Sequence, residues 1–143
     1  MKIFLDTCSL FKLYHKETGT EELEKIFSRA RISKIVLSEL TKIEFTSTVW
    51  KKVRTKEISD SDALDFLEMF ESDFEKYTFV VIDSAIVEKS RLLISRYGKQ
   101  GLRTLDSIQL STCVSLIKEV DVFLTSDKLL KSMLDAEGLA TEL

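Results

Sequence analysis

The chain has 143 residues, of which 44% are hydrophobic and 31% are charged, and its mean hydropathy is +0.01. These values are typical of one folded domain with a sizeable core, and they exclude a disordered or fibrous chain. The single histidine, His15, leaves no room for Ser-His-Asp or Cys-His catalytic machinery or for a His-rich zinc site. Any chemistry is therefore expected from carboxylates, hydroxyls, lysines or a hard metal ion.

Membrane insertion and disulfide bonding are not expected. No apolar run approaches the roughly 18 residues that a membrane-spanning helix needs. A strand pattern begins at Lys2, which leaves no room for a signal or transit peptide, so we expect a cytoplasmic location. Cys8 and Cys113 cannot make a disulfide framework and show no metal-ligand spacing, so both are expected to be small core residues.

In chain order, short apolar runs alternate with longer segments of helical spacing. Strands are expected at "KIFL" (2–5), "KIVL" (34–37), "FVVI" (79–82) and "DVFLT" (121–125). Strands separated by helices predict right-handed crossovers and a mostly parallel sheet that is covered on both faces. Because the chain has no proline, repeat or low-complexity stretch, we predict one α/β domain spanning residues 1–143.

An aromatic-rich helix is expected before the third strand, with Ser59 or Asp60 as its N-cap. "TKEIS" (55–59) is then a connection between two helices. Helical spacing places five residues on one stripe: Ala63, Leu67, Phe70, Phe74 and Tyr77. Such a stripe usually faces the core. The alternative is a contact surface formed by Phe66, Phe70 and Phe74, or by Trp50.

A further helix is expected over residues 105–117, after a turn that contains Gly98 and Gly101. Its spacing places Asp106, Gln109, Leu110 and Cys113 on one side of the helix.

The net charge of −3 is unevenly distributed. Residues 42–56 carry a net charge of +4, residues 57–77 carry −7, and residues 89–103 carry +5. These segments are either solvated helix faces or a divided surface whose basic parts face a polyanion. The basic residues that could contact a nucleic-acid backbone are Lys51, Lys52, Arg54, Arg96, Lys99 and Arg103.

Four acidic residues are placed where a parallel sheet binds its ligands, beyond the carboxyl ends of the strands. Asp6 ends the first strand, Asp127 follows the last strand, and Asp106 lies in the first turn of the helix before that strand. Helix capping alone could account for these three. It does not account for Glu44, which is expected about two turns into a helix between bulky apolar neighbours.

Converging carboxylates repel one another unless a cation holds them ionised. Without His or Cys ligands, such a site selects a hard cation, Mg²⁺ or Mn²⁺. A site of this kind suits phosphodiester hydrolysis, because the metal lowers the pKa of a bound water.

Four segments of the chain, in order and in spacing, resemble the motifs of the PIN domain family, and more narrowly those of VapC-type toxins from bacterial and archaeal toxin–antitoxin pairs. The segments are "FLDTCSL", "SELTKIEF", "LRTLDSIQLST" and "FLTSDKLL". The resemblance implies a three-layer α/β/α fold and an Mg²⁺- or Mn²⁺-dependent endoribonuclease. It also implies a VapB-like antitoxin that blocks the site, and a homodimer.

The resemblance places the catalytic and metal-binding acids at Asp6, Glu44, Asp106 and Asp127. Hydroxyl residues beside them match supporting positions that orient such acids, namely Thr7, Ser9, Thr125 and Ser126. Two residues depart from the family pattern. Gln109 stands where many relatives carry His, and Cys8 where Ser or Asn is frequent. Neither departure removes a carboxylate, so they bear on the substrate more than on activity.

Three other classes of protein were weighed against this resemblance. A response-regulator receiver needs an adjacent acidic pair after its first strand, where this chain has only Asp6, although Asp83 follows the third strand. A haloacid-dehalogenase-like phosphatase needs Asp-x-Asp after the first strand, and position 8 is Cys8. A non-catalytic PIN-like module that binds RNA or acts as a scaffold is the alternative that stays open.

Overall fold

The computed structural model describes residues 1–143. Four strands alternate with seven α-helices and two short 3-10 helices. In chain order the elements are β1 (Lys2–Leu5), α1 (Thr7–Phe11), α2 (Thr20–Arg29), β2 (Lys34–Ser38), α3 (Leu40–Arg54), α4 (Asp60–Ser72), η1 (Phe74–Lys76), β3 (Tyr77–Val80), α5 (Ser84–Tyr97), η2 (Gly98–Gln100), α6 (Thr104–Ser115), β4 (Val122–Leu124) and α7 (Lys128–Ala136).

The four strands form one parallel sheet with the order β3-β2-β1-β4. The chain runs outward from β1 through β2 to β3, and then returns to the other side of β1 to add β4. The strand order therefore reverses between β1 and β4. Ligands of open parallel sheets bind at such a reversal, beyond the carboxyl ends of the strands.

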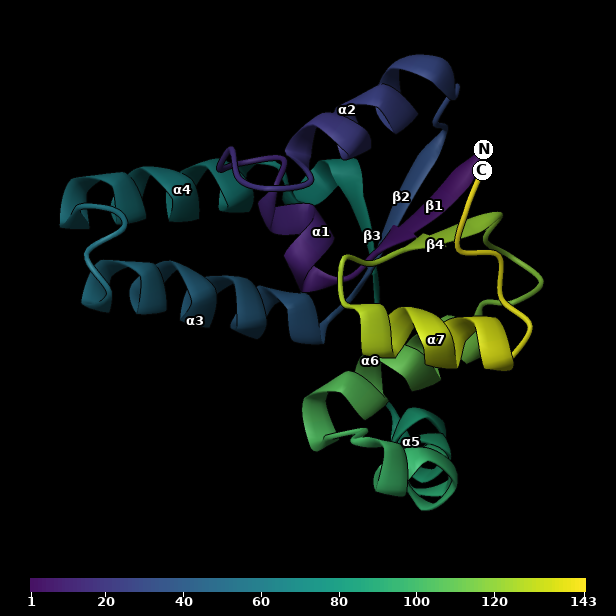
Figure 1. The fold of residues 1–143 in the computed structure, drawn as a ribbon. Helices are drawn as coiled ribbons and strands as arrows, with labels where there is room; N and C mark the ends of the chain where they lie inside the picture. Colours follow the sequence, from purple (N-terminus) through teal and green to yellow (C-terminus); the bar gives the residue numbers. More distant parts are fainter.

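Side chains of the strands alternate between two separate cores, as the period of two in a strand requires. Ile3, Leu5 and Leu37 pack with α1, α2, α3 and α4, whereas Phe4 and Val36 pack with α5, α6 and α7. Figure 1 shows the corresponding arrangement, with α5, α6 and α7 gathered on one side of the strands and the long α3–α4 hairpin extending from the other. The predicted three-layer α/β/α fold with a parallel sheet is confirmed.

The aromatic stripe is part of the core rather than a free surface. Ser59 caps α4 through a reciprocal hydrogen-bond pair with Asp62, the capping box, as the N-cap prediction required. Ala63 and Phe70 are buried, and Phe66 packs against the same core. The helix is shorter than predicted: it ends at Ser72, and the third strand already begins at Tyr77 rather than at residue 79.

The turn before α6 and the connection before α4 lie where the sequence placed them. Gly101 has a φ of +107°, a backbone conformation that a residue without Cβ adopts readily.

None of the helices combines the length and the hydrophobicity that crossing a lipid bilayer requires.

Candidate functional site

Asp6 lies where β1 passes into α1, beneath the surface of the protein. The residue is 5% exposed and its side chain caps α1, because Oδ1 accepts a hydrogen bond of 2.8 Å from the backbone N–H of Ser9. Its other oxygen, Oδ2, accepts from the hydroxyl of Thr125, just beyond β4. Burial raises the pKa of Asp6, the two hydrogen bonds oppose that rise, and the nearby carboxylate of Glu44 adds to it.

Glu44 is the fifth residue of α3, so it lies closer to the helix start than the two turns predicted. Its Oε1 accepts hydrogen bonds of 2.8 Å from the hydroxyl of Thr7 and 2.8 Å from the side-chain amide of Gln109. The same amide also donates to the hydroxyl of Thr41 over 3.2 Å. A network contributed by α1, α3 and α6 therefore fixes the Glu44 carboxylate.

Asp106 and Asp127 form the other side of the site and are much less supported. Asp127 is exposed and caps α7, with Oδ1 accepting a hydrogen bond of 3.0 Å from the backbone N–H of Leu130. Asp106, in the first turn of α6, is half-buried and accepts no hydrogen bond from the protein. Partial burial raises the pKa of Asp106, the carboxylate of Asp127 adds to that rise, and the Arg103 guanidinium opposes it.

The four predicted acids thus lie as two neighbouring pairs, Asp6 with Glu44 and Asp106 with Asp127. No three of the acidic, cysteine or histidine side chains lie close enough together to hold a metal ion as they stand. None of the four acids forms an ion pair with a lysine or arginine. Without an ion-paired cation, the four carboxylates leave a negative potential that the Arg103 guanidinium near Asp106 offsets only in part.

Cys8 connects the two pairs electrostatically, and the prediction that it is a core residue is wrong. Cys113 is buried as expected, but Cys8 is exposed at the site. Its thiol pKa is raised to about 12 by desolvation and by the carboxylates of Asp6, Glu44 and Asp127. The thiol therefore stays protonated at neutral pH and is not a nucleophile.

The residues present fit a hard divalent cation. Apart from the protonated thiol of Cys8, the available donors are carboxylate and hydroxyl oxygens, which Mg²⁺ and Mn²⁺ prefer. Asp106 has both carboxylate oxygens free of hydrogen bonds, and one oxygen is free on each of Glu44 and Asp127. A cation there would offset the mutual repulsion of the acids.

The hydroxyl residues beside the acids occupy three different environments. Thr7 donates to Glu44 and Thr125 donates to Asp6, so both hold a carboxylate in place. Ser9 is buried and contacts Asp6 through its backbone N–H. Ser126 instead accepts a hydrogen bond from the ammonium of Lys12.

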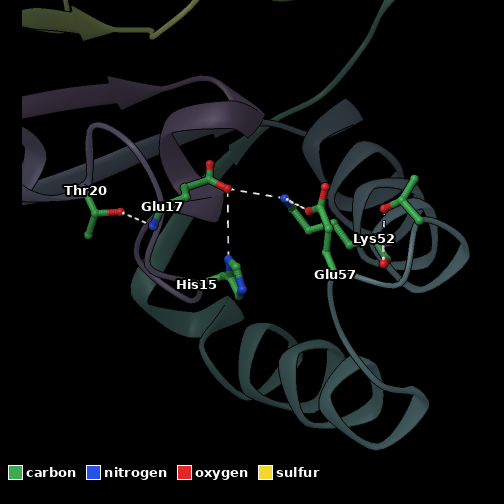
Figure 2. A network of polar contacts seen from close by, with 6 residues as sticks. His15, Glu17, Thr20, Lys52 and Glu57 are labelled. Atoms are coloured by element: carbon green, nitrogen blue, oxygen red, sulfur yellow. Dashed lines mark hydrogen bonds and ion pairs between the residues drawn. The ribbon is translucent and has the colours of Figure 1, made fainter.

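Two of the six basic residues predicted to face a polyanion are already engaged in ion pairs. Figure 2 shows Lys52 between Glu17 and Glu57, with Nζ–O distances of 3.4 Å and 2.8 Å. Arg96 forms a two-pronged contact with Glu137 over 2.7 and 2.8 Å. The other four are exposed and form no ion pair, namely Lys51, Arg54, Lys99 and Arg103.

The sequence reasoning missed Lys12 and Thr41, and it placed Gln109 on the helix side of Asp106 without giving it a role in the site. Thr41 could have been found, because it lies three residues before Glu44 and so on the same helix face. The same rule applies to Gln109, because it lies three residues after Asp106 and so on the same face of α6. No local pattern identifies Lys12, because its neighbours Leu10 and Phe11 are core residues and its partner is distant in sequence.

Comparison with solved structures finds the same fold in several proteins. FitAcB from Neisseria gonorrhoeae aligns with a TM-score of 0.73 and 15% identity over 99% of this chain and 96% of that one. VapC20 from Mycobacterium tuberculosis, described as a toxin that cleaves the sarcin-ricin loop, aligns with a TM-score of 0.69 and 11% identity over 92% of this chain and 94% of that one. VapBC-1 from nontypeable Haemophilus influenzae aligns with a TM-score of 0.66 and 16% identity over 99% and 97% of the two chains.

No curated protein sequence matches the chain. A sequence model of a protein family does match it, over residues 3–133, and that model describes the PIN domain. The match spans the strand ends that carry Asp6 and Asp127 and the helices that carry Glu44 and Asp106. The chain therefore belongs to the PIN domain family, as its four motifs predicted.

Proposed function

We propose that this protein is a metal-dependent endoribonuclease and the toxin of a VapBC-type toxin–antitoxin pair. One observation carries the proposal: four carboxylates from four separate elements lie without ion pairs at the strand reversal of a PIN-domain sheet. Capping accounts for Asp6 and Asp127, but it accounts for neither Glu44 nor Asp106. The fold shared with FitAcB and VapC20 supports the same function.

In this proposal Asp6 and Asp106 are the principal ligands of Mg²⁺ or Mn²⁺, and Glu44 and Asp127 complete the shell or orient a water. Such a cation lowers the pKa of a bound water and stabilises charge on a phosphate. Thr7 and Gln109 hold Glu44 in position, and Thr125 holds Asp6. No covalent intermediate is expected, because the only nearby thiol, Cys8, stays protonated.

Single-stranded or looped RNA is the proposed substrate, because its bases are accessible and its backbone can follow an open surface. The unpaired cations Lys51, Arg54, Lys99 and Arg103 are the candidates for contacting that backbone outside the acidic site. A VapB-like antitoxin is the proposed protein partner, and a homodimer the proposed assembly. Trp50, which is 36% exposed on α3, is a candidate contact for either.

The proposal is tested by incubating the protein with total RNA in Mg²⁺, in Mn²⁺ and in a chelator. We expect cleavage with either metal and none in the chelator. Asp6→Asn should lower the cleavage rate by more than about 100-fold, because loss of a direct ligand should exceed the 10- to 100-fold typical of supporting residues.

The matched control is Asp83→Asn. Asp83 follows β3 and caps α5 through Ile86, so it shares the capping role of Asp6 but lies outside the four acids. We expect Asp83→Asn to cleave at the wild-type rate. RNA binding without cleavage in any metal would instead support a non-catalytic PIN-like module that binds RNA or acts as a scaffold.

A further inference from the structure

A buried lysine lies beside the acidic site without an acidic partner. Lys12 directly follows α1 and is 8% exposed, yet its ammonium forms no ion pair. Its only hydrogen bond goes to the neutral hydroxyl of Ser126. An ammonium has three donors, and burying it without an anion is costly. The remaining donors are free, and no carboxylate of the chain forms an ion pair with them.

The backbone is shaped to accommodate this ammonium. Gly19, at the end of the loop between α1 and α2, has a φ of +92°, which disfavours any residue with a side chain. A Cβ at that position would lie 2.7 Å from the Nζ of Lys12. Lys12 thus spans from Gly19 to Ser126, and joins the loop before α2 to the loop that carries Thr125 and Asp127.

Lys12 also lines an open pocket of about 450 Å³ next to the acids. The other lining residues are Cys8, Glu17, Thr18, Ser126 and Asp127. Lys12 is the only cation among them, Glu17 is already paired with Lys52, and Asp127 belongs to the four acids. No aromatic side chain is present on which a base could stack. The pocket therefore suits a phosphate and its ribose, which hydroxyls and a lysine recognise, rather than a base.

We infer that Lys12 binds a backbone phosphate of the RNA, next to the phosphate that lies at the four acids. This inference rests on the proposed function, since it needs RNA as the substrate. Cys8 and Asp127 lie on the boundary between the pocket and the acidic site, so one strand can pass across both. The acids would bind a cation, and Lys12 would fix the register of the strand with respect to it.

The test is the salt dependence of RNA binding. The parent protein is Asp106→Asn, which prevents cleavage during the measurement and removes no hydrogen bond. The probe is a fluorescent single-stranded RNA oligonucleotide, whose Kd is measured over a series of NaCl concentrations. Each phosphate contact on single-stranded nucleic acid contributes about 0.7 to the slope of log K against log salt.

We expect Lys12→Met, added to the parent, to raise the Kd about tenfold and to lower that slope by about 0.7. Lys12→Arg keeps the charge and should keep the slope. Lys16→Met is the matched control, because Lys16 is exposed four residues away and the net charge changes equally. This control should shift the slope by much less.

Lys12→Gln serves as a second neutral variant that can still donate to Ser126, and thermal unfolding checks that both variants fold. A weaker affinity with an unchanged slope would show that Lys12 only holds the loop at residues 125–127, and it would overturn the inference. An unchanged Kd and slope would overturn it as well. If neither the parent nor the wild-type protein in a chelator binds the RNA, the proposed function fails together with the inference. An unchanged slope in a parent that does bind the RNA overturns the inference alone.

Discussion

On the β1 side of the site, Asp6 and Glu44 together accept hydrogen bonds from four groups. On the other side, Asp127 only caps its own helix, and Asp106 has no hydrogen-bond partner. Asp6 is buried and Asp127 is exposed. The first pair is held by side chains from α1, α6 and the loop after β4, so its geometry is fixed before any ligand arrives. The second pair is free to adjust.

The difference indicates how such a site could receive a cation and a substrate. A fixed pair loses little conformational freedom on binding, while an adjustable pair can approach a ligand that is already seated. Since no three carboxylates lie at metal-binding distance, a cation at the proposed site would require the adjustable pair to move toward it. The pairing also predicts different consequences for substitutions on the two sides.

Among the residues that hold the acids in place, the largest effect is expected at Gln109, which supports the fixed side of the site, Asp6 and Glu44. Gln109→Met removes the hydrogen bond to Glu44 while nearly keeping the side-chain volume. Because supporting residues of this kind typically contribute 10- to 100-fold to metal affinity or activity, we expect a loss of that size. The measurement is the cleavage rate as a function of Mn²⁺ concentration.

Stability is not expected to explain that loss. Methionine removes the donor to Glu44 and Thr41, but it also removes the Oε1 of Gln109, which is buried without a hydrogen-bond partner. The free energy of unfolding should therefore fall by no more than about 1.5–3 kcal/mol, the contribution of a hydrogen bond to a charged group. Gln100→Met is the matched control, since Gln100 is exposed in η2. Full activity of Gln109→Met would show that the fixed side does not depend on this amide.

Gln109 also illustrates how far the sequence could predict the site. The three-layer fold follows from alternating strand and helix patterns, and Asp6 and Asp127 follow from their places at strand ends, because these signals are local. The contact between Gln109 and Glu44 joins residues 65 positions apart, and the contact between Lys12 and Ser126 joins residues 114 apart. Such contacts depend on how the helices pack against one another, and local sequence patterns do not predict that packing.

Asp6→Asn is expected to have a smaller effect, on the stability of the metal-free protein. Burial raises the pKa of Asp6 above its ordinary value of 3.8, so the unfolded chain ionises at a lower pH than the native protein. Below pH 3.8 both states are protonated and the group contributes nothing. As the pH rises through the native-state pKa, the buried charge increasingly destabilises the native protein.

Asp6→Asn should therefore raise the Tm at pH 7 in a chelator, and this gain should disappear near pH 4. Each kcal/mol gained shifts the Tm by about 2–4 °C in a chain of this size. Adding Mn²⁺ should stabilise the wild type and not the variant, which reverses their order. A variant that is less stable than the wild type at pH 7 in the chelator would show that the two hydrogen bonds to Asp6 outweigh its desolvation.

The smallest effect concerns the outer support of the fixed side. Lys52, on α3, pairs with Glu17 in the loop that borders the Lys12 pocket and with Glu57 before α4 (Figure 2). Its ammonium also lies 5.4 Å from the centre of the Phe11 ring. Lys52→Met should lower the Tm slightly at low salt. In 1 M NaCl, where the Debye length is about 3 Å, the difference should nearly vanish.

Lys51→Met is the matched control, because Lys51 neighbours Lys52 on α3 but is exposed and forms no ion pair. Lys51→Met should leave the Tm unchanged and weaken RNA binding. Lys52→Met should lower the Tm slightly and leave RNA binding unchanged. Of these two adjacent lysines, Lys52 would then support the loop that carries Glu17, and Lys51 would contact the RNA. If Lys52→Met weakened RNA binding as much as Lys51→Met, the ion pairs of Lys52 would have to open in the complex with RNA. The loop that carries Glu17, beside Lys12, would then change its contacts on binding and would not be a rigid support for Asp6 and Glu44.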